Sequence, residues 1–149
     1  MLSKPKDGWT TVSIEDFESE ASYLVDIPFD WLNACLTGMV NKVPITLFID
    51  EEGSEVFIVS YYDVTHVIVD RADLPESITY RNIDFMDITN GIIEDIKLYF
   101  EDWVRWSPYE DTEEECKIRS VHLKKLIKET EKALKKEAER CNKRIFASL

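Results

Sequence analysis

Four carboxylates in the second half of the chain have a spacing that could serve a divalent metal ion. Glu94 and Asp95 lie seven residues before Glu101 and Asp102, so each i, i+7 pair aligns on one side of a helix and could present oxygen ligands to Mg²⁺. These acids lie away from the apolar stripe of the same segment, and Mg²⁺ sites are usually built by carboxylates from separate elements. The pattern favours a solvated helix face, and we expect no metal, no cofactor and no catalytic residues.

Cysteine and histidine are the other residues with catalytic or metal-binding chemistry. Cys35, Cys116 and Cys141 are odd in number, far apart and without CxxC spacing, which argues against a disulfide framework and a structural zinc site. We expect free thiols. A nucleophilic cysteine would need His66 or His122 beside it, and nothing in the pattern supports that pairing. His66 lies in an alternating segment, so we interpret it as a hydrogen-bonded, partly buried residue rather than a general base.

An aromatic and acidic stretch, residues 99–117 (YFEDWVRWSPYEDTEEECK), is the strongest candidate for a binding surface. Its first three rings continue the apolar stripe of a helix and are predicted to pack in the core. Trp106 and Tyr109 lie at the helix end beside Pro108, where both rings could be exposed. The predicted partner-binding residues are these two aromatics and nearby acids, with the acidic tip of a hairpin as a second contact point: Trp106, Tyr109, Glu110, Asp111, Glu113, Glu114, Asp50, Glu51 and Glu52.

Charge is distributed unevenly along the chain. Residues 1–116 carry 26 acidic and 7 basic side chains, whereas residues 117–149 carry 11 basic and 4 acidic ones, within a total net charge of −12. Helix-dipole chemistry explains part of this polarity, because acids favour the first turn of a helix and bases the last. The acidic excess predicts a basic protein partner, such as a nucleic-acid-binding enzyme or a toxin, and disfavours direct nucleic-acid binding unless the basic tail acts alone.

The first forty residues predict little sheet structure. Residues 9–12 are typical of a short strand, and residues 13–16 form a weak capping box that predicts a short helical turn. A clearer helix follows, with Asp26 as its cap, Pro28 in its first turn and Gly38 as its C-terminal stop.

The central third has the alternating period of strands. Residues 43–50 and 54–62 flank a short acidic turn in which Gly53 can take a positive φ, so they predict a hairpin. Residues 64–70 predict a third strand, the RADLPES stretch a loop, and residues 78–85 a fourth strand. The strands are apolar on both faces, so we expect helices on one side of the sheet and partial cover on the other.

The last third returns to a helical period. The apolar stripe from Ile92 to Trp106 predicts one helix that ends by Pro108. Thr112 with Glu115 predicts the cap of a second helix, from about residue 113 to 142, and residues 112–149 as a whole predict a long polarised helix with a short tail. The apolar stripe of this second helix is too polar towards its end for a coiled coil. We therefore expect the helix to lie across the sheet or the preceding helix, with a homodimer contact as the alternative.

These elements predict one α+β domain over residues 1–149, with short N-terminal helices, a three- or four-stranded antiparallel meander and two C-terminal helices packed on the sheet. No signal peptide or membrane-spanning segment is apparent, so we expect a cytoplasmic protein. The function that we expect is a small acidic protein-binding module, an inhibitor of the immunity or anti-defence type. An acidic homodimeric chaperone or adaptor and a small metal-dependent enzyme remain alternatives.

Overall fold

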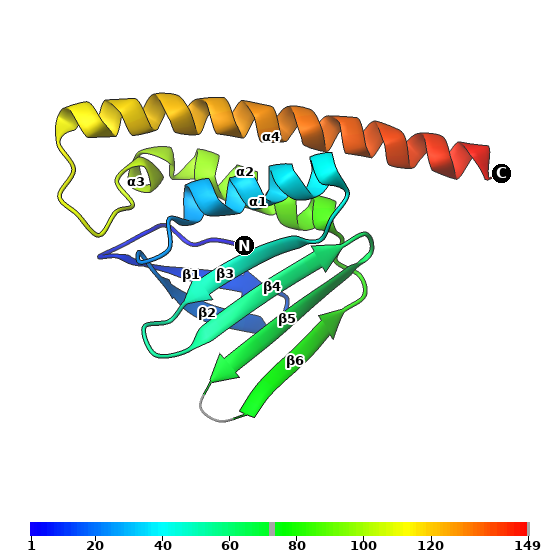
Figure 1. The fold of residues 1–149 in the computed structure, drawn as a ribbon, viewed down its shortest axis with the longest axis horizontal. Helices are drawn as coiled ribbons and strands as arrows, with labels where there is room; N and C mark the ends of the chain where they lie inside the picture. Colours follow the sequence, from blue (N-terminus) through cyan, green and yellow to red (C-terminus); the bar gives the residue numbers. More distant parts are fainter. Residues whose placement is uncertain (72–73, 149) are drawn as a thin grey trace.

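The computed structural model describes residues 1–71 and 74–148, and these form an α+β fold (Figure 1). The described residues form a two-stranded and a four-stranded antiparallel sheet. The strands are β1 (Trp9–Ile14), β2 (Phe17–Ser22), β3 (Ile45–Asp50), β4 (Glu55–Tyr61), β5 (Val64–Arg71) and β6 (Leu74–Tyr80). The helices are α1 (Ile27–Asn41), α2 (Phe85–Leu98), α3 (Phe100–Val104) and α4 (Glu113–Ala147).

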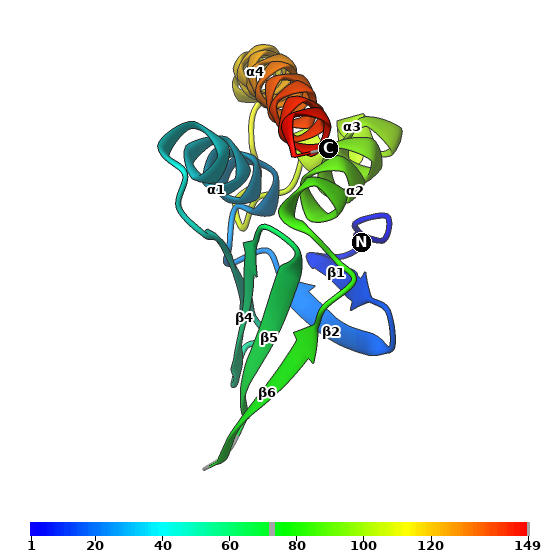
Figure 2. The ribbon, with the colours of Figure 1, turned by 90° about the vertical axis from the view of Figure 1, so that its right-hand side faces the viewer.

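The elements are stacked in layers (Figures 1 and 2). The long helix α4 lies across α1, α2 and α3, and these shorter helices separate it from the strands. The core fills the space between α1, α2, the β1–β2 hairpin and one face of the larger sheet. No helix among the described residues is long and apolar enough to cross a membrane.

The N-terminal region is a β-hairpin, so the predicted helical turn at residues 13–16 was wrong. β1 and β2 pair from Trp9↔Ser22 to Ile14↔Phe17. The two-residue turn between them places Glu15 at φ +50°, a conformation that few residue types favour. Val12, Ile14 and Phe17 are buried, and their alternation is the strand period that the capping-box reading overlooked.

Helix α1 was predicted in the correct place but with the wrong end. Pro28 occupies its first turn as expected, but the helix continues beyond Gly38 to Asn41. Lys42 then takes the left-handed conformation, with φ +58°, that ends it. Gly38 is needed for packing instead, because a Cβ there would lie 2.6 Å from Cγ1 of Ile45 on β3.

The four-stranded sheet confirms the predicted meander, in the order β3-β4-β5-β6. Every second residue of β3, β4 and β5 is buried, and the opposite face is half-buried or exposed. Two details differ from the prediction. The positive φ in the β3–β4 turn belongs to Glu52, at +57°, and not to Gly53. The fourth strand begins in the predicted loop, at Leu74, and ends at Tyr80.

The predicted helix ending near Pro108 is broken in two. α2 starts with a capping box between Asp84 and Asp87 and ends at Leu98, and Tyr99 joins it to the short α3. The C-terminal region therefore holds three helices where two were expected. The cap of α4 was predicted correctly, since Thr112 and Glu115 hydrogen-bond each other's backbone N–H groups and side chains.

Candidate protein-binding surface

The stretch of residues 99–117 is first of all a structural junction. Arg119 on α4 donates to both carboxylate oxygens of Asp26, at 2.8 Å each, and to the carbonyl oxygens of Val104 and Trp106 at 2.9 and 3.0 Å. Its guanidinium also lies 4.6 Å from the ring centroid of Phe29. One side chain therefore ties α4 to α3 and to the start of α1, and its hydrogen bonds to the Asp26 carboxylate raise the pKa of Arg119 further.

Trp106 is buried, which contradicts the expectation that its ring could be exposed. Only 4% of the residue is accessible, its ring centroid lies 5.2 Å from that of Trp103, and its indole N–H donates to the carbonyl of Val25 at 2.8 Å. A buried tryptophan with a satisfied N–H is a packing residue. In this conformation its side chain is not available to a partner.

Tyr109 and its acidic neighbours remain on the surface. Tyr109 is 78% exposed, the largest exposed fraction among the large hydrophobic side chains described. Glu110, Glu113 and Glu114 are exposed and Asp111 is half-buried. The guanidinium of Arg105 lies 3.2 Å from Glu113, and both side chains of that pair are mostly exposed. We call Tyr109, Glu110, Glu113 and Glu114 the acidic patch.

The acids of the β3–β4 turn accept hydrogen bonds within the protein. Glu51 accepts from Ser19, Ser54 and Arg71, and the Arg71 bonds hold its pKa at about 2. The two neighbouring acids also accept hydrogen bonds. Asp50 accepts from the backbone N–H of Glu52 at 2.7 Å, and Glu52 accepts from the hydroxyl of Ser22 at 2.7 Å. These carboxylates join the turn to β2 and β5, which the sequence pattern could not show.

The carboxylates considered for a metal ion are divided among structural contacts. Asp95 accepts from the backbone N–H of Leu2 at 2.7 Å, and Asp102 lies 3.9 Å from Lys4. Glu94 and Glu101 are exposed. Within the described residues, no three His, Cys, Asp or Glu side chains are grouped so that they could hold a metal ion.

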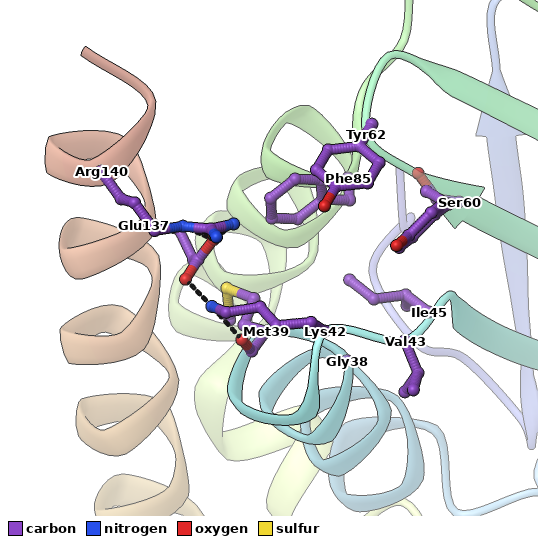
Figure 3. Close-up of a pocket in the computed structure, with 11 residues that line it drawn as sticks. Gly38, Met39, Lys42, Val43, Ile45, Ser60, Tyr62, Phe85, Glu137 and Arg140 are labelled. Atoms are coloured by element: carbon purple, nitrogen blue, oxygen red, sulfur yellow. Dashed lines mark hydrogen bonds and ion pairs between the residues drawn. The ribbon is translucent and has the colours of Figure 1, made fainter. Parts of the chain in front are cut away.

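A hollow that sequence reasoning missed lies where α1 ends, beside α4 and the β4–β5 turn (Figure 3). Its volume of about 20 Å³ is space for little more than one water molecule, so it does not suit a metabolite. Glu137 of α4 reaches its edge and pairs with Lys42 and Arg140. Burial opposes the ionisation of Glu137, but the hydrogen bonds from both cations leave its pKa below the usual value.

Two tyrosines line the rim of this hollow. Tyr61 and Tyr62 are 38% and 42% exposed, and their ring centroids are 4.3 Å apart. Tyr62 has a φ of +51°, which is unusual for a bulky side chain. A hydrogen bond with Tyr61 and a second with Arg144 lower the pKa of Tyr62. Only two adjacent tyrosines, one ending β4 and one in the turn that follows it, could have indicated this feature from sequence.

The described thiols and His66 agree with the sequence interpretation. Cys35 and Cys116 are buried, Cys141 is half-buried, and each is a free cysteine. Burial raises the pKa of Cys35 to about 12, which suppresses its thiolate form at neutral pH. His66 is half-buried and lies 3.0 Å from the hydroxyl of Thr79.

Comparison of the chain with known protein families, with curated proteins and with solved structures gives no match.

Proposed function

We propose that this chain is a protein-binding module of the inhibitor type, whose acidic patch occupies a basic site on a target protein. The observation that carries the proposal is the exposure of Tyr109 among carboxylates on an anchored segment. Exposed aromatic rings are favoured anchors at interfaces, and acidic neighbours accelerate association with a basic surface.

The anchoring of the segment supports this reading. The indole of Trp106 donates to Val25 and the guanidinium of Arg119 donates to the carbonyl of Trp106, so the chain is held three residues before Tyr109. Tyr109 is held locally as well, because its backbone N–H donates to the hydroxyl of Ser107 at 3.1 Å. A contact surface that is already ordered loses less conformational entropy on binding, and this increases affinity.

The homodimer alternative has less support than the inhibitor reading. The solvent-facing side of α4 carries exposed lysines along much of its length: Lys117, Lys124, Lys125, Lys128, Lys132, Lys135, Lys136 and Lys143. Two copies that pair in parallel through this face would bring like charges together, which opposes association. The free cysteines are typical of a protein in a reducing compartment, so they agree with a partner inside the cell.

Affinity capture from an extract of the native host tests the proposal. The baits are the wild-type chain, a Tyr109→Ala, Glu113→Lys, Glu114→Lys variant, and a Glu18→Lys, Glu20→Lys control that makes two of the same charge reversals on β2. We expect a protein with a basic surface to be enriched on the wild type and the control, and at least about tenfold less on the patch variant, because anchor residues dominate binding energy. Equal capture by all three baits would remove the acidic patch from the interface.

Purified target and surface plasmon resonance then separate the two contributions. Charge reversal at Glu113 and Glu114 should mainly lower the association rate, and its effect should shrink as salt rises, because the Debye length falls to about 8 Å at 0.15 M. Tyr109→Ala should mainly raise the dissociation rate. An association rate that does not change with salt would exclude docking through acidic steering.

A further inference from the structure

A row of basic residues follows α4 at every fourth position. We call it the basic row, and it consists of Lys124, Lys128, Lys132, Lys136, Arg140 and Arg144. Residues four apart are neighbours on a helix surface, about 5–6 Å from one another, and each step of four also turns about 40° round the axis. The row therefore follows a shallow spiral about 30 Å long, from the α3 side of α4 at Lys124 to the α1 side at Arg140. Like charges at this spacing destabilise a helix. The helix dipole favours cations only in the last turn, so helix stability does not explain the row.

The acids of α4 leave most of the row exposed to solvent. Glu131 pairs with Lys97 of α2 at 2.6 Å, and Glu137 is buried beneath the row. Among the described residues, no ion pair within 4.0 Å involves Lys128, Lys132 or Lys136, and all three are exposed. These cations are therefore available to an external anion.

The acidic side chains do not cancel the row, because residues 117–149 hold 4 acids against 11 bases and most other acids lie farther away. The β3–β4 turn and the strands are on the other side of the α1 and α2 layer (Figure 1). Glu113 precedes Lys124 by 11 residues of helix, which is about 16 Å along the axis. Charges separated by more than the Debye length of about 8 Å at 0.15 M are largely screened. The row thus presents a positive surface although the chain carries a net charge of −12.

Aromatic rings lie at the C-terminal end of the row. Arg140 lines the same hollow as Tyr61 and Tyr62 (Figure 3). The two rings are partly exposed, and the turn that presents them holds Tyr62 in an unfavourable backbone conformation. Strained residues persist where the surrounding structure supports them, and they cluster at functional sites. Cations in a row with aromatic rings at one end match the two kinds of contact that unpaired nucleotides make.

We propose that the basic row and the Tyr61–Tyr62 pair bind single-stranded nucleic acid, with phosphates along the row and an unpaired base on the tyrosine rings. An acidic protein segment fits less well, because protein interfaces depend on buried apolar anchors. Among the α4 side chains whose exposure is described, the large exposed hydrophobic residues are Ile118 and Val121, both before the row. This ligand site is separate from the acidic patch, so either proposal can fail without the other.

Fluorescence anisotropy with a labelled 20-nucleotide oligo(dT), titrated with the full chain at several salt concentrations, tests the proposal. We expect a dissociation constant of about 10⁻⁴–10⁻⁶ M near physiological salt. If six phosphates are neutralised, log K should fall with log salt with a slope of about −4, since each contact on a single strand contributes about 0.7. No binding at 50 mM salt would overturn the assignment.

Matched variants locate the site. Lys128→Glu with Lys132→Glu should weaken binding at least about tenfold and reduce the slope by about 1.4, the contribution of two contacts. Lys4→Glu with Lys6→Glu changes the net charge equally outside the row and should leave binding within about twofold. Tyr61→Ala with Tyr62→Ala should weaken binding at least about fivefold without changing the slope, because stacking is not a counterion effect. Equal losses in the row variant and the Lys4, Lys6 control would show attraction by net charge alone.

Two further ligands decide the class of partner. A 20-base-pair duplex should bind less tightly than oligo(dT), because its bases are stacked and cannot reach the tyrosines. Duplex binding that is as tight or tighter would overturn the single-strand assignment. Polyglutamate at equal charge should displace oligo(dT) poorly, and efficient displacement would instead assign the row to an acidic protein segment.

Discussion

Arg119 on α4 and Asp26 at the start of α1 are joined by two parallel hydrogen bonds of 2.8 Å, although 93 residues separate them in the chain. Asp26 occupies the N-cap position of α1, as predicted, but its side chain makes no capping bond and binds the guanidinium instead. This pair forms part of the contact that holds the junction against α1.

Arg119→Ala should lower the free energy of unfolding by about 2–4 kcal/mol, because it removes hydrogen bonds to a carboxylate and to two carbonyl groups. The control is Arg105→Ala, which removes an exposed ion pair in the same junction and should cost less than about 1 kcal/mol. Urea unfolding followed by tryptophan fluorescence measures both. Similar losses in the two variants would show that the Arg119 hydrogen bonds do not stabilise the junction.

The two neighbouring tryptophans should respond differently to replacement by Phe. The N–H of Trp103 is buried and has no hydrogen-bond partner among the described residues, whereas that of Trp106 donates to Val25. Trp103→Phe removes an unsatisfied donor, and Trp106→Phe removes a bond that contributes about 1 kcal/mol. Trp106→Phe should therefore cost about 1 kcal/mol more in urea unfolding. The reverse order would contradict the hydrogen bonding described.

Glu51 should make stability depend on pH. Its pKa is about 2 in the folded protein, below the usual 4.5, chiefly because Arg71 hydrogen-bonds its carboxylate. The stabilisation is complete above pH 4.5 and is lost as the pH falls from 4.5 to 2. We expect Glu51→Gln to cost about 1–2 kcal/mol at pH 7, with allowance for the half-exposed Arg71, and almost nothing at pH 2. Urea unfolding of the wild type and of Glu51→Gln at several pH values between 2 and 7 measures this effect. A difference in unfolding free energy that stays constant with pH would exclude the ionised pair as its cause.

The basic row should reduce the stability of α4. Lys128 has a lysine four residues away on each side, so Lys128→Glu replaces two repulsive pairs with attractive ones and should raise the free energy of unfolding by about 0.5–1 kcal/mol. Lys135 has a glutamate at both of these positions, so Lys135→Glu should lower stability by a similar amount. Thermal unfolding of the two variants compares them. A loss in both would mean that local repulsion does not act in this helix.

The thiols should react in order of exposure. An aromatic disulfide reagent should modify the half-buried Cys141 rapidly in the native protein, but Cys35 only as the chain unfolds, because burial raises its pKa to about 12 and blocks access. Mass spectrometry of samples quenched over time identifies the modified residue. Fast labelling of Cys35 under native conditions would contradict the packing of α1.

The alternating hydrophobic period predicted the antiparallel meander, and the Thr112–Glu115 capping pattern predicted the start of α4, because both depend on local sequence. The turns were harder to predict. In the turns that follow β1, α1, β3 and β4, the positive φ angles occur at Glu15, Lys42, Glu52 and Tyr62, and these residue types carry no turn signal, unlike glycine or asparagine. This is why the β1–β2 hairpin was taken for a helical turn and the end of α1 was placed at Gly38.

The candidate site shows the same limit at longer range. Tyr109 and the acids near it could be identified from composition alone. The burial of Trp106 could not, because it depends on the carbonyl of Val25, 81 residues earlier in the chain. The basic row was contained in the sequence, but its separation from the acids became visible only when α4 was placed on the far side of α1 and α2.

The contacts of α4 also determine how the protein would respond to a pulling force. α4 contacts both ends of α1, because Arg119 binds Asp26 at its start and Glu137 pairs with Lys42 just after its end. Arg119 and Glu137 are 18 residues apart on α4. A force that pulls the C-terminal end of α4 away from the body would load the Glu137 ion pairs first, then the Lys97–Glu131 pair, and the Arg119 hydrogen bonds last. The helix would therefore detach progressively from its C-terminal end.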